Sequence, residues 1–179
     1  MTAPDLANLL FDTPTGIDDL SVPAKTLLLA QDRIADRLYL IRKGALRLFF
    51  ADGSGREISF QFFFEGDMVA SFASLYRREP SLFSLESIEP TTLSVLGRDE
   101  LFARIETTPA IRRAYEEKLA DRFRSYQRLF LSRITKTPRQ RYEALLEERP
   151  DIVRRVPQHY LASYLGITPV SLSRIRNRR

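Results

Sequence analysis

Arginines near the C-terminal end of this 179-residue chain are its strongest candidates for binding chemistry. They follow Thr168-Pro169, a pair that favours a helix start, because threonine caps a first turn and the N–H that proline lacks has no partner there. We expect Arg174 to fork onto the O6 and N7 edge of guanine, and Val170 to contact a thymine methyl. The predicted DNA-contacting residues are Thr168, Pro169, Val170, Ser171, Arg174, Arg176 and Arg178.

A helix-turn-helix would position these residues. Leu161 and Leu165 give the preceding segment an apolar face, Gly166 can end that helix, and Leu172 gives the second segment its own apolar face. Residues 133–179 hold eleven Lys/Arg against four Asp/Glu, which leaves a net −2 for the rest of the +5 chain. Arg176 and Arg178 are therefore assigned to phosphates. The alternative is an ordinary helical hairpin with a basic, solvated face.

Between about residues 22 and 96, short runs of β-forming residues alternate with turn residues. Several such runs in succession predict an antiparallel barrel or jelly roll. We expect strands at residues 26–30, 37–41, 45–50, 57–62 and 82–96, the last of which holds two strands. The aromatic run 60–64 is expected in the core, with a stacking platform for bases as the alternative.

A helical period follows residue 99, where apolar residues recur every three or four positions. This pattern predicts one long amphipathic helix. Its apolar seam either covers the β domain or pairs with a second copy, and we expect both, because helix-turn-helix proteins usually read two half-sites as two-fold dimers. The seam consists of Ile111, Tyr115, Leu119, Phe123, Tyr126 and Phe130.

The predicted fold class is therefore α+β, with three parts. A β-barrel domain occupies residues 1–108, a dimerisation helix and hinge occupy residues 109–134, and a helix-turn-helix domain occupies residues 135–179. We expect the hinge at the junction around residues 132–137, where the apolar seam stops and where a cap at Thr137, a first-turn proline and Gln140 restart a helix.

Composition excludes several classes of function. The chain has no cysteine and one histidine, His159, so disulfides and iron–sulfur clusters are excluded, and we expect His159 on a helix surface rather than on haem. No nucleophile–histidine pair, metal-spaced ligand set or glycine-rich phosphate loop is present, so neither an enzyme nor a metal site is expected, and no cofactor is evident. Without a ~20-residue apolar span or a signal peptide, we expect a cytoplasmic protein with no membrane partner.

In this order of elements the chain resembles the cyclic-AMP receptor protein and fumarate–nitrate regulator (Crp/Fnr) family of bacterial transcription factors. Residues 36–44 are similar to the family's strand-to-turn signature, residues 64–69 to its Pro-Gly-Asp turn, and the C-terminal motif completes the resemblance. It implies a cyclic-nucleotide-binding-like jelly-roll barrel, a shared dimer helix and a DNA-binding domain that reorients when the barrel pocket is filled. The implied partners are double-stranded DNA and a second copy of the chain, with RNA polymerase as a further candidate.

The family's nucleotide-binding residues carry over poorly. Cyclic-nucleotide-binding members have a Gly-Glu-Leu run and an Arg-Ser pair, where this chain has Ala70-Ser71-Phe72 and Ser81-Leu82. A buried phosphate without a cationic clamp loses its hydration with little return, so a classical cyclic-AMP response is not expected and the effector is unknown. The candidate pocket residues are Ser71, Phe72, Arg77, Ser81 and Tyr126, with packing roles as the alternative.

The family's β wing is expected to be truncated, since the sequence ends after the second helix of the motif. Further phosphate contacts would then come from Arg139, Arg141, Arg154 and Arg155. The sequence predicts a sequence-specific, homodimeric DNA-binding regulator of the Crp/Fnr type. The alternative is a dimeric ligand-binding or adaptor protein with a degenerate DNA-binding domain.

Overall fold

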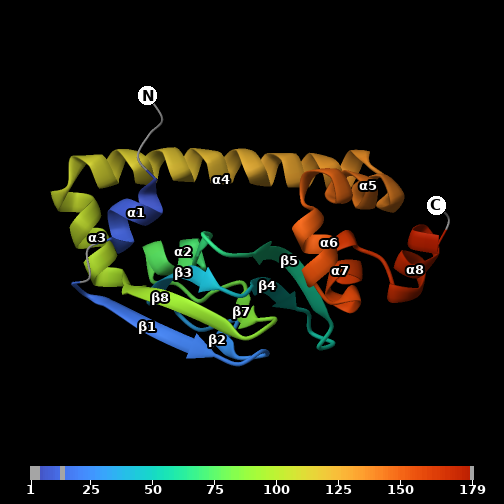
Figure 1. The fold of residues 1–179 in the computed structure, drawn as a ribbon, viewed down its shortest axis with the longest axis horizontal. Coiled ribbons are helices and arrows are strands. Elements are labelled where there is room, and N and C mark those ends of the chain that lie inside the picture. Colours follow the sequence, from blue (N-terminus) through green and yellow to red (C-terminus); the bar gives the residue numbers. More distant parts are fainter. Residues whose placement is uncertain (1–4, 13–14, 178–179) are drawn as a thin grey trace.

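The computed structural model describes residues 5–12 and 15–177 and confirms the α+β class (Figure 1). The strands are β1 (Ile17–Val22), β2 (Leu27–Leu29), β3 (Arg37–Lys43), β4 (Leu46–Ala51), β5 (Glu57–Phe63), β6 (Met68–Val69), β7 (Ser84–Ser87) and β8 (Thr91–Gly97). The helices are α1 (Leu6–Phe11), α2 (Phe72–Arg77), α3 (Arg98–Thr107), α4 (Pro109–Thr135), α5 (Pro138–Glu148), α6 (Pro150–Arg155), α7 (Gln158–Leu165) and α8 (Pro169–Asn177).

The strands form two antiparallel sheets, ordered β1-β8-β3-β6 and β2-β7-β4-β5. Their inward faces make one core, because alternate residues of a strand point to the same side. This core includes Ile41, Leu46 and Leu93, all buried. The jelly-roll barrel predicted from the sequence is confirmed.

Gly44 shows why the turn between β3 and β4 is so tight. Its φ of 99° lies in the left-handed region, and a Cβ at this position would lie 2.6 Å from the carbonyl oxygen of Pro90. A larger residue would therefore separate β3 from the loop before β8.

Several elements were not expected from the sequence. They are α1, β1, β6, α2, α3 and the short helix α6. Pro150 occupies the first turn of α6, where its missing N–H leaves no helical hydrogen bond broken. Helix α6 therefore follows α5 with one residue, Arg149, between them.

Helix α4 runs along most of the molecule and joins the barrel to the C-terminal helices (Figure 1). Its first turns pack on α1 and α3, where Ile111 and Ala114 share a core with Leu10 and Leu101. None of the described helices is both long and apolar enough to cross a membrane.

Helices α5–α8 gather beyond the other end of the barrel, with α7 against β5 (Figure 1). Their core is continuous with the barrel, because Ala45, Phe62 and Phe64 cluster with buried residues of these helices. The members of this shared core from residues 138–177 are Tyr142, Leu145, Ile152, Val156, Leu161, Ala162, Leu165 and Leu172, of which Val156 directly follows α6 and the others lie in helices.

Candidate DNA-binding interface

The turn between α7 and α8 is built by two residues with local reasons for their positions. Gly166 ends α7 with a φ of 71°, and its N–H bonds to the Ser163 carbonyl at 3.0 Å. Thr168 precedes α8, and its Oγ1 accepts from the backbone N–H of Ser171 at 3.2 Å. The two predicted helices and their turn are therefore present.

The outer face of α8 is open to solvent. Leu172 is fully buried against α7, whereas Val170 is 62% exposed, and Arg174 and Arg176 are also exposed. Val170 and Arg174 are four residues apart and share one helix face. Thr168 and Pro169 are exposed at its start. Arg178 lies outside the described residues.

The other cations proposed for phosphate contact are Arg139 and Arg154, which are exposed, and Arg141 and Arg155, which are half-buried. The Arg141 guanidinium donates to the carbonyl oxygen of Leu165 at 2.8 Å, at the end of α7, where a cation stabilises the helix dipole. Arg133 donates to the neighbouring carbonyl of Tyr164. Burial, and then the nearby Arg141, lower the pKa of Arg133. Arg154 is exposed, so it is more accessible to DNA than these two structural arginines.

The expected dimer seam divides into an inner and an outer part. Ile111 is buried and Tyr115 and Leu119 are half-buried, all in the N-terminal half of α4. Phe123 and Phe130 are each 65% exposed. Large exposed apolar residues continue to the end of the helix at Leu131 and Ile134, so the C-terminal half of α4 leaves a continuous apolar surface uncovered within one chain.

Of the five candidate pocket residues, Phe72 and Tyr126 line one cavity, whereas Ser71, Arg77 and Ser81 do not. Ser71 and Ser81 are buried, with their hydroxyl oxygens 2.7 Å apart, and Ser81 Oγ lies 2.6 Å from the carbonyl oxygen of Phe83. Their hydrogen-bonding capacity is used inside the barrel. Arg77 is exposed in the last turn of α2, and Phe72 stacks against Tyr76 with ring centroids 6.2 Å apart.

Aromatic side chains occupy the neighbouring space. The Phe60 and Phe83 rings stack at 4.7 Å, and Tyr126 of α4 lies 5.8 Å from Phe60. Phe60 and Phe83 are packed on the barrel core, as expected for the aromatic run. These side chains present no fixed cation to a phosphate, so the residues present do not fit the family's clamp for a cyclic nucleotide.

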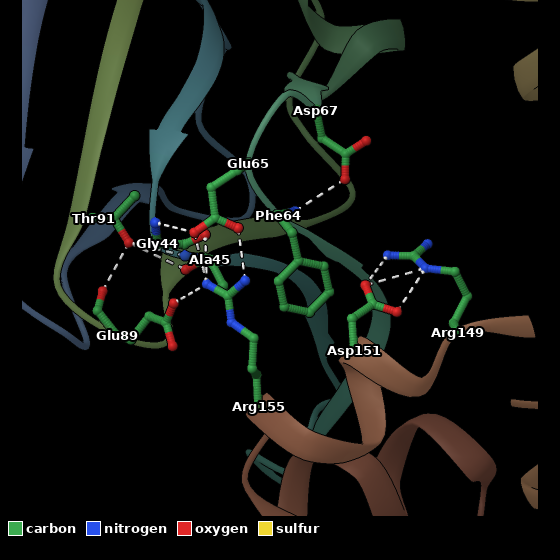
Figure 2. A network of polar contacts seen from close by, with 10 residues as sticks. All are labelled: Gly44, Ala45, Phe64, Glu65, Asp67, Glu89, Thr91, Arg149, Asp151 and Arg155. Carbon is green, nitrogen blue, oxygen red and sulfur yellow. Dashed lines mark hydrogen bonds and ion pairs between the residues drawn. The ribbon is translucent and has the colours of Figure 1, made fainter. Parts of the chain in front are cut away.

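Arg155 of α6 ties the helices to the barrel (Figure 2). Its guanidinium binds Glu65 in a fork, with N–O distances of 2.6 and 2.9 Å, and also contacts Glu89 and the Gly44 carbonyl. It lies over the Phe64 ring, 4.7 Å from the centroid. The hydrogen bonds from Arg155 hold the pKa of Glu65 at about 2. We call this cluster of Arg155, Glu65 and Glu89 the α6 latch.

A second tie is centred on Arg47 of β4, which is 1% exposed. Its guanidinium is held by Glu57 at 2.5 Å and Glu86 at 2.9 Å. The Tyr160 ring of α7 lies over it, 3.7 Å from ring centroid to guanidinium carbon. A cation desolvated against an aromatic face gains about 2 kcal/mol. The first helix of the motif is therefore docked on the barrel.

Neither the α6 latch nor the contacts of Arg47 were predicted from the sequence. Arg155 and Glu65 are 90 residues apart, and a solvated charge on α6 looks no different from a paired one. The only local hint was Arg47, a cation between apolar residues in a predicted strand. Hydrogen bonds of Ser163 to β5 complete the docking, with the backbone N–H of Ser59 donating to its Oγ at 3.0 Å.

Comparisons with known proteins agree with this fold. The family model described as "Cyclic nucleotide-binding domain" matches residues 19–108. Among curated proteins, the sequence finds no match. The structure of FixK2 from Bradyrhizobium japonicum is similar with a TM-score of 0.80 and 20% identity, over 90% of this chain and 83% of that one.

Two further solved structures share the fold. The c-di-GMP-responsive global regulator CLP from Xanthomonas campestris has a TM-score of 0.76 and 17% identity, over 96% of this chain and 90% of that one. A putative transcriptional regulator of the Crp/Fnr family from Eubacterium rectale has a TM-score of 0.74 and 20% identity, over 97% and 81%. With half of its length matched by the family model and this fold extending through its C-terminal helices, the chain belongs to the cyclic nucleotide-binding domain family and has the architecture of the Crp/Fnr regulators.

Proposed function

We propose that the protein is a sequence-specific DNA-binding transcription regulator that acts as a homodimer. The observation that carries this proposal is the exposed face of α8, where Val170 and Arg174 stand on a helix fixed by the buried Leu172. In a helix-turn-helix, the solvent-facing helix enters the major groove and the first helix packs behind it. Here α8 is the solvent-facing, arginine-bearing helix and α7 packs behind it.

Dimerisation supplies the second half-site in this proposal. The exposed apolar surface of α4, from Phe123 to Ile134, is supported as the contact between copies by its length and continuity. Pairing of two such helices would bury these side chains in a coiled-coil-like seam. It would also relate the two α8 helices by a two-fold axis.

The proposed regulator does not depend on classical cyclic AMP. Support comes from Ser71 and Ser81, which stand where the family's glutamate and clamp are expected and bond to each other instead. Phe60 and Phe83 stack close by. DNA binding is therefore expected to be the same with and without this nucleotide.

The test is selection from a random duplex pool by the purified chain at near-physiological salt, with and without cyclic AMP. We expect a two-fold symmetric motif with half-sites about one helical turn apart, unchanged by the nucleotide. Enrichment only with cyclic AMP would overturn the effector part of the proposal. If the chain is dimeric but binds DNA without sequence preference or not at all, the result would favour the adaptor alternative. In that alternative the C-terminal helices pack on the barrel and do not bind DNA.

A further inference from the structure

A cavity lies between α1, α2 and the middle turns of α4, with Leu38 of β3 and Met68 of β6 also in its wall. Its volume is about 220 Å³, and apolar side chains make most of its wall. Leu10 and Leu75 are fully buried there, and Leu101 is 1% exposed. The described residues that line it include neither Ser71 nor Ser81. Phe72 and Tyr126, two of the five candidate pocket residues, do line it, so the cavity adjoins the place where the family resemblance put the nucleotide but lacks the two positions of its phosphate clamp and glutamate.

Tyr115, which lines the cavity, carries a buried polar atom without a partner in the described part of the chain. The hydroxyl of Tyr115 is buried and has no hydrogen-bond partner among the described residues. Burial raises the pKa of Tyr115 to about 12, so the hydroxyl remains a proton donor at neutral pH. Leaving such a donor unpaired is unfavourable, and a ligand acceptor would satisfy it.

The charged residues that line the cavity are both cationic. Lys118 and Arg122 follow Tyr115 by three and seven residues, and so lie on the same side of α4. Arg122 is held in place, since its guanidinium donates to the Met68 carbonyl at 3.2 Å and lies 5.0 Å from the centre of the Phe63 ring. An apolar chamber with cations at one side is complementary to a molecule with an apolar chain and an anionic head.

We propose that this cavity binds an amphiphilic monoanion of the medium-chain carboxylate type. The alkyl chain lies against Leu38, Leu119 and Phe123, lining residues that keep accessible apolar surface. The carboxylate is bound by Lys118 and Arg122 and accepts from the Tyr115 hydroxyl. The site goes beyond the proposed regulator function, because its occupancy is measured without DNA.

The cavity also borders the surface proposed for dimerisation. Phe123 and Tyr126 line it and are exposed on α4. A bound chain would therefore fill space directly beneath these two side chains. This continuity gives the occupant a route to the contact between copies.

The first experiment is calorimetric titration of the full-length protein with decanoate, decanol and decyltrimethylammonium, each below its critical micelle concentration. We expect decanoate to bind most tightly and the cation most weakly. Octanoate should bind about fifteenfold more weakly than decanoate, because it has two methylenes fewer and each buried methylene contributes about fourfold in affinity. Equal affinity for decanoate and decanol, or no binding of decanoate, would overturn the anion site.

Variants then locate the binding. Lys118→Ala should weaken decanoate about fivefold and leave decanol unchanged. Tyr115→Phe should weaken decanoate about threefold to tenfold without lowering the melting temperature, since it removes an unpaired buried hydroxyl. The control is Arg113→Ala, an exposed cation of the same helix outside the cavity lining. A loss in the control equal to that of Lys118→Ala would overturn the proposal.

Discussion

The α6 latch allows its contribution to stability to be worked out from the structure. Arg155→Gln removes the guanidinium that joins α6 to Glu65 and Glu89 and retains much of the aliphatic stem. The Glu65 pKa of about 2, against its ordinary 4.5, corresponds to about 3 kcal/mol for a fully shielded pair. The Arg155 and Glu65 side chains are 32% and 42% exposed, so solvent screening reduces the expected loss to about 1 kcal/mol.

The loss should depend on pH in one direction. Because folding lowers the pKa of Glu65, the contribution of its carboxylate is fully present above pH 4.5 and is lost as the pH falls through about 2. By pH 3 less than about half of it remains. The difference in unfolding free energy between the parent protein and Arg155→Gln should therefore shrink to roughly 0.5 kcal/mol or less at pH 3.

The assay is urea unfolding followed by circular dichroism at pH 7, 5 and 3. The matched control is Arg154→Gln, a change to the neighbouring, exposed cation of α6, which should alter the unfolding free energy by less than about 0.5 kcal/mol at every pH. Two results would refute the reasoning. One is an equal effect of both substitutions, and the other is an Arg155→Gln difference that stays constant from pH 7 to pH 3.

Three further predictions concern the DNA face, the dimer surface and the turn of the motif. Arg174→Ala should cost about 1–3 kcal/mol of DNA-binding free energy and relax the preference at one base position, whereas Arg176→Ala should weaken binding to all sequences alike and lower the salt slope by about one. Both effects are measured by fluorescence anisotropy across salt concentrations. Equal losses that do not depend on DNA sequence would contradict base reading by Arg174. Phe130→Glu should yield a monomer in sedimentation, because a charge in an apolar seam is unfavourable, and a dimer would contradict the proposed surface. Gly166→Ala should lower the free energy of unfolding by about 1–2 kcal/mol, since φ is 71° and the new Cβ would lie 3.0 Å from Nη1 of Arg133; unchanged thermal unfolding would contradict this.

Most of the barrel could be predicted because its signals are local. The expected strand at residues 37–41 is β3, and the expected turn at Gly44 follows it. The first strand was missed for a physical reason. Asp18 and Asp19 interrupt its alternation, and β1 is placed by pairing with β8, where Leu20 stands opposite Leu93. That pairing joins residues more than seventy positions apart.

The same distinction between local and distant signals applies to the candidate site. Gly166 and Thr168 determine the turn of the motif through their own backbone conformation and side-chain bonds, so the sequence reveals them. The docking of α7 depends on Arg47 and Tyr160, which meet only in the fold. Hydrophobic periodicity likewise predicted the seam of α4, but which turns are covered depends on where α1 and α3 end.

The core shared by the barrel and the C-terminal helices has a consequence for how the protein unfolds. Phe62 and Phe64 of the barrel are buried in one cluster with Leu161 and Leu165 of α7. Neither the barrel nor the C-terminal helices can therefore unfold without exposing apolar surface of the other. Separate domains would melt in separate steps. This chain should instead melt cooperatively, in one calorimetric transition. Amide protons of β5 and α7 should be protected against exchange to the same degree and lose that protection under the same conditions.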